Sequence, residues 1–215
     1  MAIDVRLIWE KLPFLLGGAW TTFSLTCVSM VFATVAGLIV GLLNMFGGRV
    51  LGTITRVYIE AVRGTPALLL ILIVYYALPR IGLNFPQFPA AAVSLAVCYA
   101  AYIAEVFRSA VESIPMGQTE AAYSLGMSRM QSLRYIILPQ TFRRVLPPLA
   151  NEFAALIKDT SLVAFISMED LLFRSKMVSA ATYDYFSPLV GAALIYLVMT
   201  LPIMQWSRNL EKKVD

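Results

Sequence analysis

Residues 120–139 read EAAYSLGMSRMQSLRYIILP, a polar and basic stretch of helix-forming residues with a single glycine, Gly126. Long apolar stretches lie on both sides of it. The surrounding region, residues 109–147, is too polar to cross a lipid core that offers no hydrogen-bond partners, and too regular to be disordered. The alternation predicts an all-α membrane protein in which this region lies outside the bilayer.

The composition supports an integral membrane protein. Hydrophobic residues make up 59% of the 215 residues and charged residues 14%. The mean hydropathy is +0.75, well outside the range of soluble domains. Asp4, Arg6, Glu10 and Lys11 interrupt the N-terminal stretch, which therefore lacks the pattern of a cleaved secretory signal and is expected to be retained.

Enzymatic and metal chemistry have little support in the residue types present. The chain has no histidine, the commonest metal ligand and general base. Cys27 and Cys98 lie in separate apolar segments, where a small soft side chain packs well, so neither a disulfide nor a metal site is expected.

Five apolar runs approach the length of about 20 residues that a membrane-spanning helix needs. They cover residues 17–45, 58–78, 89–107, 149–168 and 186–206. Residues 1–16 are expected to form a short amphipathic helix at the outer interface, ending near Pro13 and Gly17, although simple fraying is also compatible with the sequence.

The distribution of lysine and arginine predicts the orientation of these five spans. One side carries Arg49, Arg56, Arg108, Arg129, Arg134, Arg143, Arg144, Arg208, Lys212 and Lys213. The other carries Arg6, Lys11, Arg80, Arg174 and Lys176. The excess of basic residues on the first side favours an N-terminus outside the cell and a C-terminus in the cytoplasm. It also places residues 109–147 in the cytoplasm. The net charge of +4 is explained by this bias, so no nucleic-acid partner is expected.

Two short helices are predicted in the cytoplasmic segment. Thr119 is a suitable N-cap for a helix through Leu125, with Glu120 in its first turn. Gly126 then allows a turn before a second helix from about Ser128, which Pro139 closes or kinks.

The same segment resembles the EAA motif of permease subunits in binding-protein-dependent, ATP-driven importers. The match rests on Glu120, Ala121, Ala122, Gly126, Ile136, Leu138 and Pro139. The resemblance implies a coupling helix that inserts into a groove of the ATPase subunit. Its implied contact residues are Ala121, Ala122 and Gly126, with Glu120 and Arg129 as polar partners. The alternative is a solvated helix-turn-helix loop.

Ionisable residues inside apolar spans are candidate site residues, because they usually face a bundle interior or a water-filled cavity. In the second span, Glu60 and Arg63 are spaced to pair, and Gly64-Thr65-Pro66 predicts a kink. This group fits either an ion pair with a structural kink or a ligand or gate role.

The third span places Tyr102, Glu105, Arg108 and Glu112 on one helical stripe. Glu105 and Arg108 can pair, and a structural pair is favoured over substrate contact for them. Tyr102, which lies deeper, is the better substrate candidate.

The fourth span contains Lys158, Asp159, Thr160 and Ser161 near its middle, where transporters tend to place their site. Both signs of charge and two hydroxyls suit a zwitterion, with Asp159 receiving its ammonium and donors near Gly64 and Thr65 its carboxylate. Adjacent residues point about 100° apart, however. An interhelical polar lock is the competing interpretation.

Four motifs in order, RGTP, AYIAEVFRSA, GQTEAA with its downstream ILP, and KDTSL, are similar to those of polar amino acid permeases, a subset of the EAA family. The resemblance implies the type I importer permease fold of five transmembrane helices in the bacterial inner membrane. It also implies a second permease subunit (the same chain or a paralogue), two ATP-binding subunits and an extracytoplasmic substrate-binding protein. Leu69-Leu70-Ile71 depart from relatives that often have a glutamine there.

The chain has no G-x-x-x-x-G-K-[ST] phosphate loop, so ATP and Mg are expected on a separate ATPase subunit and no cofactor in this chain. The competing functions are an ATP-independent channel or proton-coupled carrier using Lys158 and Asp159, an intramembrane enzyme, and a structural scaffold. Copurification distinguishes the channel or carrier from an ATP-driven importer, because a stoichiometric ATPase partner would reject the carrier. The enzyme lacks a nucleophile-base pair, and the scaffold leaves the charged residues within the spans unexplained.

Overall fold

The computed structural model describes residues 3–214, with side chains through residue 212. Met1, Ala2 and the side chain of Lys213, included in the predictions above, lie outside the described part. The described chain contains helices and no strand. The α-helices are α1 (Val5–Phe46), α2 (Gly48–Arg63), α3 (Ala67–Leu72), α4 (Gln87–Glu112), α5 (Met116–Ser124), α6 (Arg129–Ser132), α7 (Leu138–Asp159), α8 (Leu171–Thr182) and α9 (Phe186–Val214). The π-helical turns are η1 (Ile73–Ala77) and η3 (Leu133–Ile137), and the 3-10 turns are η2 (Leu78–Ile81) and η4 (Thr160–Ile166).

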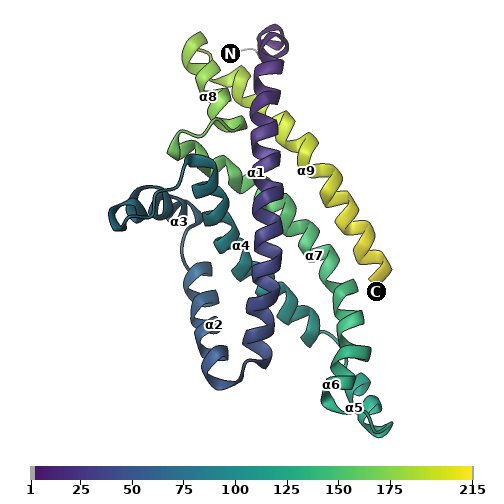
Figure 1. The fold of residues 1–215 in the computed structure, drawn as a ribbon. Coiled ribbons are helices and arrows are strands. Elements are labelled where there is room, and N and C mark those ends of the chain that lie inside the picture. Colours follow the sequence, from purple (N-terminus) through teal and green to yellow (C-terminus); the bar gives the residue numbers. More distant parts are fainter. Residues whose placement is uncertain (1–2, 215) are drawn as a thin grey trace.

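Helix α1 runs along the centre of the molecule, with the N-terminus and α8 at one end and α5 and α6 at the other (Figure 1). Its N-cap residue is Asp4, whose carboxylate accepts a hydrogen bond from the Leu7 amide, and the helix continues through Pro13. The predicted separate helix over residues 1–16 is therefore wrong in its end. Gly17, the other predicted end, also lies inside α1. The next residue, Gly18, lets α8 approach, because a Cβ added there would lie 2.8 Å from the Asp170 carbonyl oxygen.

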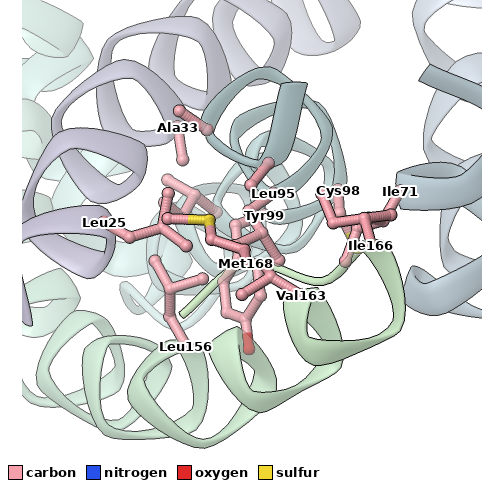
Figure 2. Packing of buried hydrophobic residues seen from close by; sticks show 13 residues of the cluster. Leu25, Ala33, Ile71, Leu95, Cys98, Tyr99, Leu156, Val163, Ile166 and Met168 are labelled. Carbon is pink, nitrogen blue, oxygen red and sulfur yellow. The ribbon is translucent and has the colours of Figure 1, made fainter. Parts of the chain in front are cut away.

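Helices α1 and α4 pack through small residues. A Cβ added to Gly37 would lie 2.8 Å from the Ala100 carbonyl oxygen, and one added to Gly41 would lie 3.3 Å from that of Ala104. Such positions let two membrane helices approach closely and gain van der Waals contact where lipid supplies no hydrophobic drive. Around this seam lies the main core, whose residues come from α1, α3, α4, α7 and η4 (Figure 2).

The predicted span over residues 58–78 is broken in the structure. Helix α2 starts already at Gly48, and the chain bends by 102° between α2 and the α3 to η2 stretch. Pro66 supplies the break, since it lacks a backbone N–H and precedes α3 as its N-cap residue. The predicted kink at Gly64-Thr65-Pro66 is confirmed, but the bend is large enough to divide the predicted span into two helical segments. Helix α3 projects sideways from the bundle (Figure 1).

Helices α1, α4 and α9 are long and apolar enough to cross a membrane, and the bent pair of α2 with α3 to η2 would make a fourth span. Helix α7 has a polar face and is not among the helices whose hydropathy is high enough for a membrane span. It also begins at Leu138 and ends at Asp159, followed by the η4 turn, so the predicted helix over residues 149–168 is wrong in its bounds.

The EAA region forms two short helices, as predicted, with different boundaries. Helix α5 begins after Pro115, which places Thr119 inside the helix and Glu120 beyond its first turn. The start near Ser128 is confirmed by a capping box with Gln131. Pro139 does not close the second helix, because α6, η3 and α7 follow one another without a break and Pro139 is the second residue of α7. The π-helical turn η3 ends two residues before it.

At the opposite end, Asp170 caps α8 by accepting hydrogen bonds from the Leu172 and Phe173 amides. The Tyr196 hydroxyl of α9 donates to the same carboxylate. Burial nevertheless dominates and raises the pKa of Asp170 to about 6. This carboxyl ties α8 to α9 beside the N-terminal half of α1.

Candidate functional site

A polar cavity of about 400 Å³ lies between α2, α4 and α7. Two arginines and two glutamates line it beside a tyrosine ring: Arg63, Arg144, Glu105, Glu152 and Tyr102. Other parts of its wall are small or apolar. A cavity with both signs of charge within a bundle of apolar helices can bind a small zwitterion.

Arg63 ends α2 and reaches across to α4. Its Nη1 lies 3.7 Å from Glu105 Oε1, and its guanidinium lies 5.6 Å from the centre of the Tyr102 ring. The predicted pairing of Glu60 with Arg63 is wrong, since Glu60 is exposed and makes no ion pair in the described chain. Sequence spacing suggested the neighbour on the same helix, but α2 packs against α4, and Arg63 at the end of α2 reaches Glu105.

The predicted pair of Glu105 and Arg108 is confirmed. Arg108 donates two hydrogen bonds to Glu105, at 3.1 Å from Nε and 2.6 Å from Nη2, and a further one to Glu112. Glu105 therefore has two guanidinium partners, Arg63 and Arg108. Its charge is already satisfied, which makes it a positioning group for Arg63 more than a free receptor for a cation.

Glu152 is a cavity residue that the sequence analysis missed. It lies on α7, half-buried, and makes no ion pair with any described residue. Glu152 and Asp159 are seven residues apart, so they share one face of the helix. That face is turned to the stripe of Tyr99, Tyr102 and Glu105 on α4. The signal in the sequence was this seven-residue spacing of carboxylates.

The four polar residues 158–161 do not form one group. Asp159 accepts a hydrogen bond of 2.9 Å from the Tyr99 hydroxyl. Thr160 is fully buried and donates to the Ile157 carbonyl at 2.6 Å. Lys158 is exposed and Ser161 is half-buried. The helix ends here, and of these four residues only Asp159 makes a hydrogen bond to the stripe on α4.

The bend after α2 presents no free hydroxyl either. Thr65 donates to the Ala61 carbonyl at 2.8 Å, while Gly64 and Pro66 are exposed. Among the predicted substrate contacts, the structure brings Tyr102 and Glu105 together in the cavity. It leaves seven out of the cavity wall: Gly64, Thr65, Pro66, Lys158, Asp159, Thr160 and Ser161.

The EAA segment ends α5 in a turn centred on Gly126, with φ of 78°. The Met127 amide donates to the Ala122 carbonyl at 3.1 Å and the Gly126 amide to that of Tyr123 at 2.9 Å, the hydrogen bonds of a Schellman C-cap. Ala122 is buried, so it packs inward and supports α5.

The remaining predicted contacts, Glu120, Ala121, Gly126 and Arg129, are exposed. Exposed apolar side chains accompany them that the sequence analysis did not select. Leu125 is 82% exposed, Met116 79% and Met130 69%. Apolar side chains this exposed on a polar, helical segment indicate a surface that a partner covers.

Comparison with known proteins identifies this arrangement. Residues 33–215 match the family described as binding-protein-dependent transport system inner membrane component. The chain belongs to this family. The permease is 39% identical over 210 residues to the probable amino-acid ABC transporter permease protein YckA of Bacillus subtilis, covering 98% of this chain and 93% of that protein.

A second relative is the glutamine transport system permease protein GlnP of Escherichia coli, 36% identical over 216 residues, with 100% of this chain and 99% of GlnP covered. Among solved structures, the crystal structure of an amino acid ABC transporter with histidines superposes with a TM-score of 0.94. It shares 34% sequence identity with the permease and covers 99% of this chain and 100% of that chain. The resemblance to ABC importer permeases is thus confirmed. The permease is an inner-membrane subunit, and ATP hydrolysis is carried out by a separate ATPase subunit.

Proposed function

We propose that this permease is the transmembrane subunit of an ATP-driven importer that carries a polar amino acid across the bacterial cytoplasmic membrane. The polar cavity between α2, α4 and α7 is the observation that supports this most. An amino acid zwitterion needs a carboxylate for its ammonium and a basic group for its carboxylate, and charged hydrogen bonds of both kinds are strong where water is scarce. Both relatives and the solved structure are named for amino acids.

Within the cavity, Arg63 is the proposed receptor for the substrate carboxylate and Glu152 for the ammonium group. Glu105 holds the Arg63 guanidinium at 3.7 Å, and the Tyr102 ring closes one wall. Asp159 remains a proposed substrate contact deeper along the same face, which would require it to release the Tyr99 hydroxyl. The other predicted contacts, Gly64, Thr65, Pro66, Lys158, Thr160 and Ser161, would be reached only in another conformation.

The proposed architecture is a single transmembrane domain over residues 1–215 with five spans: α1, the α2–α3 pair, α4, α7 and α9. The N-terminus lies outside and the C-terminus in the cytoplasm. The excess of arginine and lysine on one side supports this orientation. So does the position of α5 and α6 at the end of the molecule opposite the N-terminus (Figure 1).

Transport would proceed by alternating access in a complex of two permease subunits, two ATPase subunits and an extracytoplasmic substrate-binding protein. ATP, with Mg, is bound by the ATPase subunits. ATP binding closes the ATPase pair, pushes the EAA segments together and opens the pathway outward, and hydrolysis resets it. The exposed residues Leu125 and Met130 and the turn at Gly126 supply the contact that differs between the two states.

The test is the ATPase activity of the purified complex across a panel of amino acids, sugars and peptides. We expect stimulation by one or a few polar amino acids, reduced in Glu152→Gln and in Arg63→Gln. The matched control is Glu60→Gln, because Glu60 is exposed on the same helix as Arg63 and unpaired in the described chain. Stimulation only by sugars or peptides would overturn the substrate class.

A further inference from the structure

Arg144 lies on α7 in the wall of the polar cavity, where the proposed substrate binding gives it no role. It is half-buried and forms no ion pair with any residue in the described part of the chain. Its Nη1 group instead reaches α4, where it donates to the carbonyl oxygen of Ser113 at 2.8 Å and to the hydroxyl oxygen of the same residue at 2.9 Å. Hydrogen bonds from a charged donor are about twice as strong as neutral ones, so Arg144 ties α7 to the end of α4.

Ser113 connects the cavity to the EAA segment. It is the C-cap residue of α4, where the helix dipole favours a cation such as the Arg144 guanidinium. Only residues 113–115 separate α4 from α5. Within this connection Ile114 is buried, and the ring of Pro115 fixes its φ. Such a short and restricted connection passes a displacement of α5 on to Ser113.

On the other side of this link, α7 carries Arg144 and Glu152 into the same cavity. Glu152 lies eight residues further along the helix, about 12 Å by the helical rise. Between the two lie Pro147 and Pro148, which lack the N–H groups that would bond the carbonyls one turn earlier. The helix is therefore easiest to bend at these prolines, and a displacement of Arg144 there moves Glu152 relative to α4.

We propose that Arg144 is the positioning residue that couples the EAA segment to the polar cavity. The ATPase cycle moves α5, Ser113 follows through the short connection, Arg144 follows through its two hydrogen bonds, and α7 bends beside Glu152. This role rests on the proposed function and needs no contact between Arg144 and the substrate. Coupling between two sites is reciprocal in binding free energy, so the same link conveys amino acid binding to the ATPase subunits.

The experiment reconstitutes the full complex with its binding protein and measures how far a saturating amino acid raises the ATPase activity above its value without amino acid. Arg144→Met keeps a side chain of similar length and removes every hydrogen-bond donor. We expect the rise to be about 10-fold smaller or less than in the unchanged complex, since loss of a hydrogen bond from a charged group shifts an equilibrium by about that factor or more. The matched control is Arg143→Met, because Arg143 is the exposed neighbour and does not line the cavity; its rise should stay unchanged.

Arg144→Lys keeps the charge and can donate to one oxygen of Ser113, so an intermediate rise is expected. Retention of the ATPase subunit on purification shows which variants assemble. Should Arg144→Met fail to assemble, the comparison of Arg144→Lys with Arg143→Lys carries the test: a smaller rise only in Arg144→Lys supports the coupling role, and equal rises contradict it.

Three results would overturn the coupling role of Arg144. They are a full rise in Arg144→Met, an equal loss in Arg143→Met, and a loss in Arg144→Met at low amino acid concentration that disappears at saturation, since the last is the behaviour of a substrate contact. The proposed transport function is tested separately by the unchanged complex. Absence of any rise there rejects that function, whereas a rise that persists in Arg144→Met rejects only the coupling role.

Discussion

Replacing Gly126 tests whether the turn after α5 transmits the ATPase cycle. Its φ of 78° lies in the left-handed region, and no atom lies within 4 Å of the position that a Cβ would occupy. Side-chain bulk is therefore tolerated, and the penalty comes from the backbone. An L-residue in this conformation costs about 1–2 kcal/mol, more for β-branched residues and less for asparagine. Such a penalty changes the population of the turn about 5- to 30-fold.

We expect amino acid uptake per ATP hydrolysed to fall in the order Gly126, Gly126→Asn, Gly126→Ala, Gly126→Val in proteoliposomes containing the whole complex. Retention of the ATPase subunit on purification shows that each variant assembles. Gly117→Ala is the matched control, because Gly117 lies within α5, has open space around it and no positive φ. Coupling as tight in Gly126→Val as in the unchanged protein, or as weak in Gly126→Asn as in Gly126→Val, would refute the backbone argument.

Three further predictions concern packing, pH and the cavity. Gly37→Ala should destabilise the protein by about 1–3 kcal/mol, because its Cβ would meet the Ala100 carbonyl oxygen at 2.8 Å; a melting temperature no lower than that of Gly117→Ala would contradict this. The pKa of Asp170 is raised from 3.8 to about 6. The protonated carboxyl therefore adds to the free energy of unfolding below pH 3.8, and this contribution, about 3 kcal/mol, is lost as the pH rises through 6. Asp170→Asn, which keeps a capping oxygen, should flatten the dependence of the melting temperature on pH between 4 and 7; an unchanged profile would exclude Asp170 as its source. Glu152→Gln should raise KM for the amino acid about 10-fold or more, as loss of a charged hydrogen bond does, and an effect on kcat alone would argue against ground-state binding.

Much of the fold follows from local properties of the chain. The apolar runs predicted α1, α4 and α9, since a helix that crosses the hydrocarbon core must be apolar over its length. Ser128 and Gly126 also marked real helix ends, because capping and a left-handed turn depend on a few neighbouring residues. These features need no knowledge of distant contacts.

The errors arose where contacts between distant parts of the chain determine the helix ends and the side-chain partners. The N-terminal part of α2 is amphipathic, so a search for apolar runs missed its start at Gly48. Pro139 was taken as a helix end, but the helical run continues through it, directly after the π-helical turn η3. Arg63 was paired with Glu60, which is close in sequence. Its actual partner, Glu105, comes within reach through the packing of α2 against α4, which local spacing does not reveal. Glu152 was overlooked because Arg63, Tyr102 and Glu105, which line the cavity with it, lie on other helices.

The most direct test of the central proposal is uptake of radiolabelled polar amino acids into proteoliposomes containing the permease, its ATPase subunit and its binding protein. The account predicts uptake that requires ATP and the binding protein and persists when the proton gradient is collapsed. Uptake driven by a proton gradient without ATP would contradict it.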